Sequence, residues 1–303
     1  MNNLGNLNAA LGYIESKLDA EIHMQDIARI MCCSSYNVQR MFSFLAGVPL
    51  SEYIRNRRLT LAAMELQQGL IQVNDVSVKY GYNSPTAFTR AFTAFHGITP
   101  NEAKQQGATL KVYPRMTFSV SITGGTELNY RIEKIPAFKA VGIEIASPLN
   151  EEGFQMPVKL WQESFQNGKM DELCALAGER TITTKPYALP IYGIANHRGI
   201  DEEHFSYLIA CMEPENHEST AFCAADIPEQ TYVILQSGLY AADDRSAIQK
   251  QVNGIQRRFY GEWLPTVSYE KEDGPELEVY YQDGRSAWVE MWYPIRNLTG
   301  GKS

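Results

Sequence analysis

Two arginines, Arg40 and Arg90, occupy matching positions in a segment that occurs twice near the start of the chain. Aligning them, a shift of fifty, also places Ser34 on Ser84. Each copy reads as a short helix, a tight turn, a second helix and an exit at glycine, the pattern of a helix-turn-helix unit. Arginine and polar neighbours on an exposed helix can hydrogen-bond base edges in a major groove. Two such units predict a chain that reads two successive grooves.

Helical periodicity sorts the second helix of each copy into an inner and an outer face. The residues expected inside are Val38, Met41, Phe42 and Leu45 in the first copy and Phe88, Phe92 and Phe95 in the second. The outward residues, predicted to contact DNA, are Ser35, Tyr36, Gln39 and Arg40 in the first copy and Thr86, Thr89 and Arg90 in the second. Ser34 and Ser84 are predicted N-caps, and Pro85 is expected at the first helical position.

A long helix is expected between the two copies, over LSEYIRNRRLTLAAMELQQG, ending at Gly69. Roughly eighteen residues at ~1.5 Å each span about 27 Å. Adjacent major grooves on one face of B-DNA lie ~34 Å apart. A helix of this length therefore suits two reading helices at about that separation.

Length, charge and cysteines bound the class of protein. The chain has 303 residues, enough for two domains, and a net charge of −8. Through Lys111 there are ten Lys/Arg against eight Asp/Glu, or +2, and the remainder holds seventeen against twenty-seven, or −10. A slightly basic first third permits phosphate contacts. No export signal or apolar run of ~20 residues is evident, so we expect a cytoplasmic protein without a membrane partner. The five scattered cysteines lack a C-x-x-C pair and favour core thiols over disulfides or zinc.

The motif GYNSPTAFTRAFTAFHGITPNEAK resembles the signature of the AraC/XylS family of transcription regulators, and VQRMFSFLAGVPLSEYIRNRRL resembles its first reading helix and linker. The match covers about residues 7–107. It implies promoter DNA and RNA polymerase as partners. Cys32 departs from the family because glycine usually stands at the first turn, and a positive φ there would cost ~1 kcal/mol. Asn101–Lys104 also lacks the family's aromatic-Arg pair.

In the second half of the chain, several segments alternate apolar and polar residues, the pattern of β-strands. NYRIEKIPAFKAVGIEI, YALPIYGIAN, ELEVYYQ and AWVEMWYPI are expected strands, and Phe118 to Ile122 followed by Gly124-Gly125 suggests a further strand and turn. An echo at a shift of ninety-two places Ile135-Pro136 on Ile227-Pro228, with a helix after each copy. We therefore expect an α+β domain with a pseudo-two-fold antiparallel sheet and two main helices.

IPAFKAVGI, IPEQTYVIL, GEWLPTVSYEKEDGPELEVYY and WVEMWYPI resemble the GyrI-like effector-binding domain of regulators such as Rob and BmrR, over about residues 113–296. By this resemblance Glu278 is the carboxylate of an aromatic-lined cavity, with Glu290 as the alternative. An anion among aromatic rings suits an organic cation, through Coulomb attraction and cation–π contact. The aromatic residues predicted to bind the ligand are Trp161, Tyr192, Tyr280, Trp292 and Tyr293.

The fold class is therefore multidomain: an all-α double helix-turn-helix domain over 1–107, a linker over 108–112 and a GyrI-like α+β domain over 113–303. The leading hypothesis is a transcription regulator that binds DNA and a small-molecule effector, as a monomer or homodimer. The alternatives are a protein-docking module and a small hydrolase. Five histidines without triad or metal spacing, and the lack of a phosphate-cradling glycine loop, argue against an enzyme, a cofactor and a metal site.

Overall fold

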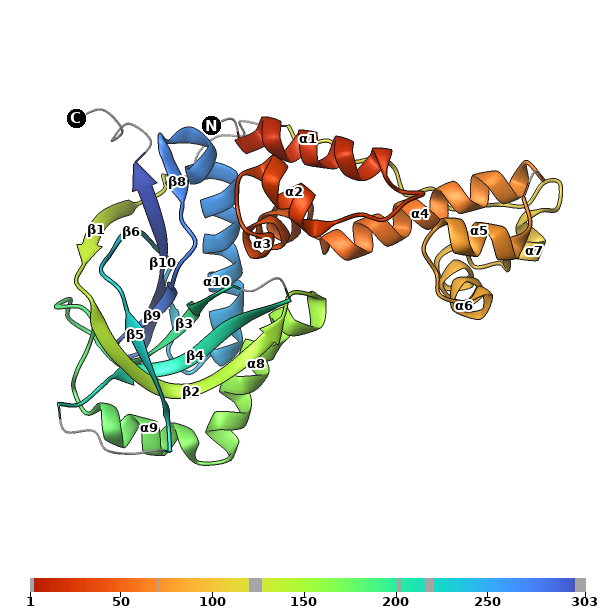
Figure 1. The fold of residues 1–303 in the computed structure, drawn as a ribbon. Helices are drawn as coiled ribbons and strands as arrows, with labels where there is room; N and C mark the ends of the chain where they lie inside the picture. The colour runs from red at the N-terminus through yellow and green to blue at the C-terminus, as the bar shows by residue number, and fades with distance from the viewer. Residues whose placement is uncertain (1–2, 70, 120–126, 201–202, 216–220, 298–303) are drawn as a thin grey trace. The chain divides into compact units, whose positions relative to one another are not determined.

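The computed structural model describes residues 3–69, 71–119, 127–200, 203–215 and 221–297 (Figure 1). Two compact units make up the chain. The helical unit holds Asn2–Val38 and Ala46–Ser121, and the sheet unit holds Ile122–Ser303 together with Gln39–Leu45. No helix within the described ranges combines the length and apolar character needed to cross a membrane.

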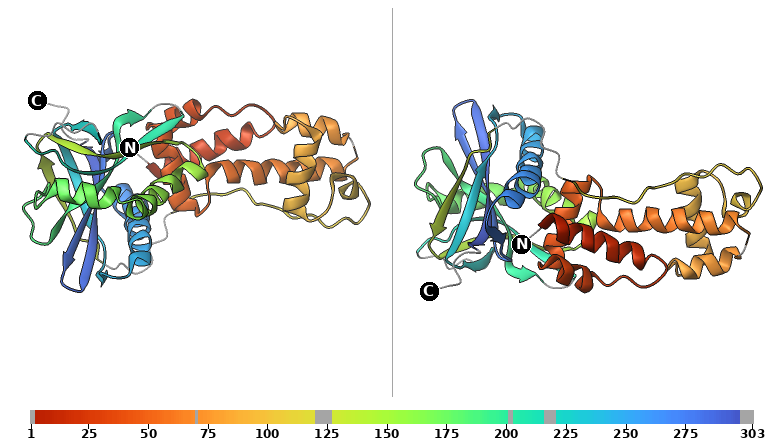
Figure 2. Two further views of the ribbon diagram at one scale, coloured as in Figure 1. Left: turned by 90° about the horizontal axis from the view of Figure 1, so that it is seen from below. Right: turned by 90° about the horizontal axis from the view of Figure 1, so that it is seen from above.

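The helices of the first 119 residues follow the duplicated pattern. They are α1 (Asn3–Ser16), α2 (Met24–Met31), α3 (Ser35–Ala46), α4 (Leu50–Gln67), α5 (Val73–Lys79), α6 (Pro85–His96) and α7 (Pro100–Ala103). The long connecting helix is confirmed, since α4 has 18 residues. Figures 1 and 2 show α5, α6 and α7 gathered at the C-terminal end of α4.

The turns between the paired helices adopt the same left-handed conformation in both copies. Cys32, after α2, has φ 53° and ψ 39°, and Gly81, after α5, has φ 79°. In each turn the next amide donates to a carbonyl five residues back, Cys33 N to Ala28 O at 3.1 Å and Tyr82 N to Ser77 O at 2.9 Å. Cysteine thus occupies a backbone conformation that suits glycine.

The predicted caps are confirmed. Ser34 Oγ accepts from the backbone N–H of Asn37 at 3.3 Å, and Ser84 Oγ accepts from that of Ala87 at 3.2 Å. Pro85 stands at the first position of α6, as expected. On the inner faces, Val38 and Phe42 of α3 and Phe88 and Phe92 of α6 are buried, and Phe95 packs partly buried against the core that contains Phe88 and Phe92.

An extended strap, residues 108–119, runs back along the helical unit. Its amides donate to side chains of three helices: Lys111 N to His96 Nδ1 at 3.2 Å, Tyr113 N to Thr60 Oγ1 at 2.9 Å and Phe118 N to Asn8 Oδ1 at 2.9 Å. Arg57 Nη1 also donates to the carbonyl of Tyr113 at 2.6 Å. The strap therefore belongs to the helical unit, beyond the boundary expected at 107. It contains no strand, and the remainder of the strand and turn expected over 118–125 lies outside the described residues.

The sheet unit is antiparallel, as expected. Its strands are β1 (Tyr130–Ile135), β2 (Phe138–Pro148), β3 (Ala188–Ile200), β4 (His204–Met212), β5 (Cys223–Ile227), β6 (Gln230–Gln236), β7 (Tyr240–Ala241), β8 (Tyr269–Lys271), β9 (Glu276–Asp283) and β10 (Ser286–Asn297). Its helices are α8 (Glu151–Gln166), α9 (Lys169–Ala177) and α10 (Arg245–Arg258), the last continued by a π-helical turn over Phe259–Trp263.

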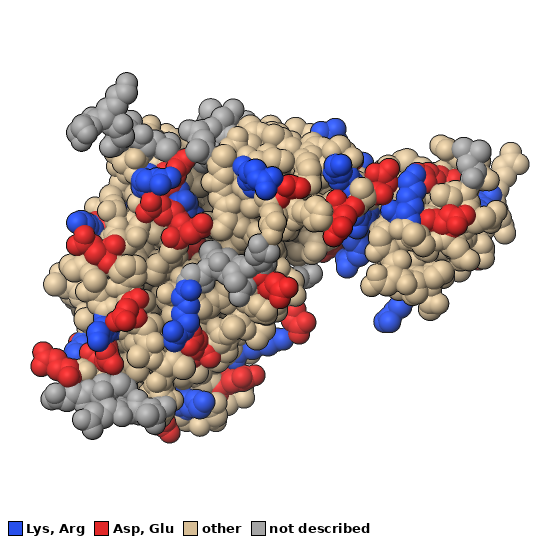
Figure 3. All heavy atoms as spheres, in the orientation of Figure 1, with Lys and Arg blue, Asp and Glu red and all other residues tan. Residues whose placement is uncertain are grey.

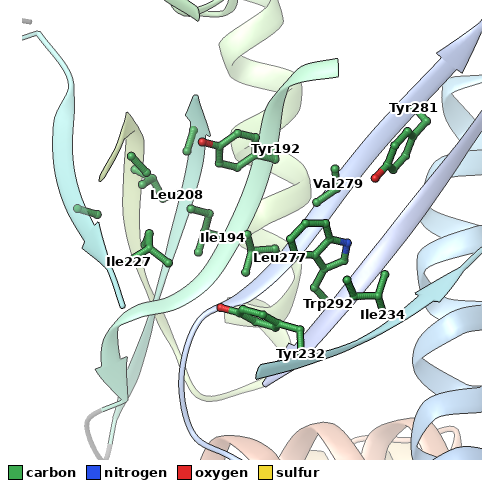
Figure 4. Packing of buried hydrophobic residues seen from close by; sticks show 13 residues of the cluster. Tyr192, Ile194, Leu208, Ile227, Tyr232, Ile234, Leu277, Val279, Tyr281 and Trp292 are labelled. Atoms are coloured by element: carbon green, nitrogen blue, oxygen red, sulfur yellow. The ribbon is translucent and has the colours of Figure 1, made fainter. Parts of the chain in front are cut away.

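The pseudo-two-fold relation appears in the strand order β1-β6-β10-β9-β3-β4-β2-β5, which is symmetric about the β9–β3 pair. The echoed segments form the β1–β2 and β5–β6 pairs of strands, and these exchange partners: β1 pairs with β6, and β2 pairs with β5. One face of the curled sheet closes on an apolar core that contains Tyr192, Leu277 and Trp292, each fully buried (Figure 4).

The Cys32 turn yields a stability prediction. A left-handed backbone costs a residue with a Cβ ~1 kcal/mol, so Cys32→Gly should raise the free energy of unfolding of the helical unit by about that amount. Urea denaturation measures the change. Gly81→Ala is the reciprocal control and should destabilise, because its Cβ would also lie 3.0 Å from Arg58 Nη1. Equal stability of Cys32→Gly and wild type would contradict the argument.

His96 makes the helical unit sensitive to acid. Its Nδ1 accepts from Lys111 N, so its Nε2 carries the proton and donates to Leu59 O at 3.1 Å, the neutral tautomer. Burial lowers the pKa of His96 below 6.5. As pH falls, His96 therefore takes up a proton in the unfolded chain before it does so in the folded protein. The stability contributed by neutral His96 is complete above about pH 6.5 and is lost as pH drops below that value, by at most ~1.4 kcal/mol per pH unit. Unfolding measured between pH 5 and 7 should show this slope, and His96→Gln should remove it.

Candidate DNA interface and effector site

The second reading helix presents its polar side to an open groove in the helical unit. Thr86 and Arg90 are exposed and Thr89 is half-buried. The groove has a volume of about 730 Å³ and is lined by Gln72, Val73, Asn74, Pro85, Thr86, Thr89, Arg90, Thr93 and Asn101. The structure thus brings the three predicted residues of α6 together with polar side chains from the starts of α5 and α7.

Arg90 is the only cation lining this groove, and it forms no ion pair with any described residue. Its guanidinium is therefore available to a phosphate or to guanine O6 and N7. Thr89 donates its hydroxyl hydrogen to Pro85 O at 2.8 Å, which leaves its oxygen as an acceptor. Sequence reasoning missed Asn74, Thr93 and Asn101. Thr93 could have been found from its spacing of four to Thr89, whereas the others depend on how α5 and α7 pack.

The first reading helix, α3, is less open than expected. Ser35, Gln39 and Arg40 are half-buried. Tyr36 is only 1 % exposed, so the expectation that it faces outward is wrong for this structure. An aromatic ring gains free energy by leaving water, and helical periodicity alone does not reveal what covers it.

In the sheet unit, Glu278 on β9 is the centre of a hydrogen-bonded group. Tyr280 Oη donates to Glu278 Oε2 at 2.7 Å, and Tyr207 Oη donates to the same oxygen at 3.2 Å. Trp161 Nε1, from α8, donates to Tyr207 Oη at 2.8 Å. The Trp161 and Tyr280 rings meet edge to face, with centroids 5.5 Å apart. Three predicted site residues therefore lie together, joined by Tyr207, which the sequence prediction had not selected.

Burial sets the electrostatics of this group. Loss of water raises the pKa of the half-buried Glu278 carboxyl, and the hydrogen bonds from Tyr280 and Tyr207, together with the charge of Arg40, offset only part of that rise. Burial likewise raises the pKa of Tyr280 well above its usual value, so its hydroxyl stays a donor. Ionised Glu278 is thus held at a cost that a nearby positive charge would reduce.

Glu290, the alternative carboxylate, lies on the opposite face of the sheet. It pairs across strands with Val279, a neighbour of Glu278 on β9. Arg131 donates to both of its oxygens, at 2.6 and 2.7 Å, and Lys185 lies 3.2 Å from Oε1. Burial alone would raise the pKa of Glu290, but Arg131 brings it below its usual range. A fully buried carboxylate that already holds two cations does not offer its charge to a ligand.

The remaining predicted ligand residues are separated from Glu278. Tyr192 and Trp292 belong to the closed core on the other face, and both are 0 % exposed. Tyr293 shares the face of Glu278, but its ring stacks on Phe259 with centroids 3.9 Å apart and is also 0 % exposed. The expectation that these three rings line one pocket is wrong, because strand alternation and stacking place their surfaces in the core.

The surface around the sheet unit carries no field of one sign on the face drawn in Figure 3, where acidic and basic side chains are interspersed. Across the described part of the chain, no three His, Cys, Asp or Glu side chains are placed to hold a metal ion.

Comparisons with known proteins agree with this division. A model of a helix-turn-helix domain matches residues 27–106, and a model described as integron-associated effector binding protein matches residues 131–295. The HTH-type transcriptional activator AarP of Providencia stuartii is 38% identical over 95 residues, 31% of this chain and 70% of that protein. The transcriptional regulator Rob of Salmonella typhimurium is 31% identical over 100 residues, 33% of this chain and 35% of that protein.

Among solved structures, SAV2435 bound to tetraphenylphosphonium aligns with a TM-score of 0.45 and 16% identity, covering 57% of this chain and 97% of that one. The family models, which together account for both units, identify the chain. It belongs to the integron-associated effector-binding family through its sheet unit and carries an AraC-type helix-turn-helix domain, which makes it a DNA-binding transcription regulator with an effector-binding domain.

Proposed function

We propose that α6 reads one major groove of a promoter and that α3 reads the next. The observation that carries this proposal is the groove beside α6, where Arg90 is exposed and Thr86 and Thr89 adjoin it. Gln39 and Arg40 are the residues proposed to read the other groove. Since α4 spans about 27 Å, close to the ~34 Å between adjacent grooves, a monomer suffices for this mode, although a homodimer is compatible with it. The similarity to an activator supports RNA polymerase as a partner of the bound chain.

The effector proposed for the sheet unit is an organic cation that binds at Glu278. The support is a half-buried carboxylate beside the rings of Trp161 and Tyr280. A cation here gains Coulomb attraction from Glu278 and cation–π attraction of ~0.5–2 kcal/mol from the rings. It also relieves the cost of keeping that carboxylate ionised away from water.

Replacing Arg90 tests the DNA-reading proposal. Arg90→Ala should weaken binding to a duplex selected by the wild-type protein by ~1–3 kcal/mol, roughly 5- to 150-fold, because a base or phosphate contact is lost. Fluorescence anisotropy at fixed salt measures the affinity. Arg257→Ala, at an exposed position of α10, is the matched control and should bind as wild type. Equal affinity of the Arg90 variant and wild type would refute the proposal.

The two carboxylates should respond oppositely to neutralisation. At neutral pH, Glu278→Gln should raise the Tm of the ligand-free protein, since it removes a charge that burial disfavours while its amide oxygen still accepts from both tyrosines. Glu290→Gln should destabilise by ~3–5 kcal/mol, because Arg131 and Lys185 both lose this buried carboxylate, although Arg131 stays paired with Glu133.

The same variants test the ligand. Tetraphenylphosphonium should raise the Tm of the wild type in a concentration-dependent way but not that of Glu278→Gln, whose DNA affinity should stay unchanged. An equal Tm increase in both proteins would reject Glu278 as the cation-binding group.

A further inference from the structure

Gly193 lies at the centre of the sheet, directly beneath the Glu278 group. It belongs to β3 and pairs with Glu278 of β9 on one side and with Ile209 of β4 on the other. Paired residues of antiparallel strands point to the same face. A side chain at this position would therefore emerge beside the Glu278 carboxylate.

The space above Gly193 is filled by two side chains of the site. A Cβ added here would lie 2.4 Å from Tyr207 Oη, 3.1 Å from Tyr207 Cζ and 3.2 Å from Glu278 Oε2. The backbone itself does not require glycine, since its φ is outside the left-handed range. Gly142 differs, because a Cβ there would lie 1.9 Å from the backbone oxygen of Ile209. Only Gly193 leaves room specifically for the Tyr207–Glu278 contact.

The Tyr207 side chain extends from β4 over β3, above Gly193. It pairs with Ala195 on β3, yet its hydroxyl reaches Glu278 on β9, on the far side of β3. Because the indole N–H of Trp161 can only donate, the Tyr207 oxygen accepts it and directs its own hydrogen to the carboxylate. With a Cβ at position 193, the Tyr207 hydroxyl could not keep this position, because the two atoms would lie 2.4 Å apart.

Because Tyr207 reaches across β3 to Glu278, it determines which oxygen of that carboxylate remains available to a ligand. A carboxylate oxygen has about two acceptor positions, and Oε2 already accepts from Tyr207 and Tyr280. Oε1 forms no hydrogen bond with the described residues. A ligand therefore meets one oxygen, which suits an onium cation held by charge and aromatic contact, whereas an amidinium binds best to both oxygens at once.

We propose that Gly193 is a specificity-determining positioning residue: by lacking a side chain it lets Tyr207 occupy Glu278 Oε2, so that the site selects onium cations over amidinium cations. The choice of ligand rests on the proposed function, whereas the link from Gly193 through Tyr207 to Glu278 does not. Both parts are testable in the full-length protein.

The first test needs no ligand. Infrared titration of the Glu278 carboxyl, identified by subtracting Glu278→Gln, gives the pH at which it ionises. Gly193→Ala and Tyr207→Phe should both move that pH upward, because the ionised form loses a hydrogen bond. The double variant should move it no further than Tyr207→Phe alone, since the alanine acts through Tyr207. An unchanged titration in Gly193→Ala, or additive shifts in the double variant, would overturn the positioning role.

The second test measures selectivity with tetraphenylphosphonium and benzamidinium by calorimetry. Wild type should favour tetraphenylphosphonium, and the ratio of the two affinities should fall about tenfold in Tyr207→Phe and in Gly193→Ala, the scale of one hydrogen bond to a charged group. Gly254→Ala, in α10 with no atom within 4 Å of the added Cβ, should keep the wild-type ratio. An unchanged ratio in both variants would overturn the specificity role. If wild type binds neither cation, the proposed function fails, and the titration still decides the positioning role.

Discussion

The pairing of β3 with β9 is the constraint on which the sheet unit depends. It sits at the pseudo-two-fold centre of the strand order, and its register places Gly193 opposite Glu278. Because alternate residues point to opposite faces, Glu278 of β9 and Glu290 of β10 lie in different environments. Glu290 faces the closed core and is neutralised by Arg131, whereas Glu278 faces Trp161 and accepts its hydrogen bonds from the hydroxyls of Tyr280 and Tyr207. The same sheet thus neutralises one carboxylate with two cations and leaves the other among hydroxyl groups.

In the helical unit, by contrast, a duplicated local pattern of turns and helix caps sets the geometry. Both turns place a left-handed residue after the first helix of the unit, and both second helices begin with a capping serine. The strap joins helices that the duplicated pattern does not connect, because its amides donate hydrogen bonds to side chains of α6, α4 and α1. Side chains that accept hydrogen bonds from those amides, such as His96 and Thr60, therefore fix the strap as well as their own helices.

Much of this could be predicted from the sequence, because it depends on spacing within single elements. The presence of α4, the serine caps and the shared face of Glu278 and Tyr280 follow from local spacing, and the unfavourable turn at Cys32 follows from the family resemblance. What could not be predicted depends on tertiary register. The sequence alone does not reveal that Tyr192 lies on the opposite face of the sheet from Glu278, or that Tyr207 reaches across β3. The cover over Tyr36 and the contribution of Asn74 and Asn101 to the groove are likewise set by packing between elements.

The exchange of strands between the two halves of the sheet also bears on how the chain reaches its native state. Tyr130 at the start of β1 pairs with Leu235 in β6, so the first strand of the sheet has no partner until about one hundred further residues exist. Neither half can complete its edges alone, and closure of so long a loop is slow. The helices of the N-terminal unit make mostly short-range contacts and emerge first during synthesis. This topology predicts that the helical unit folds early during synthesis and that the sheet unit closes later, once β6 is available to β1.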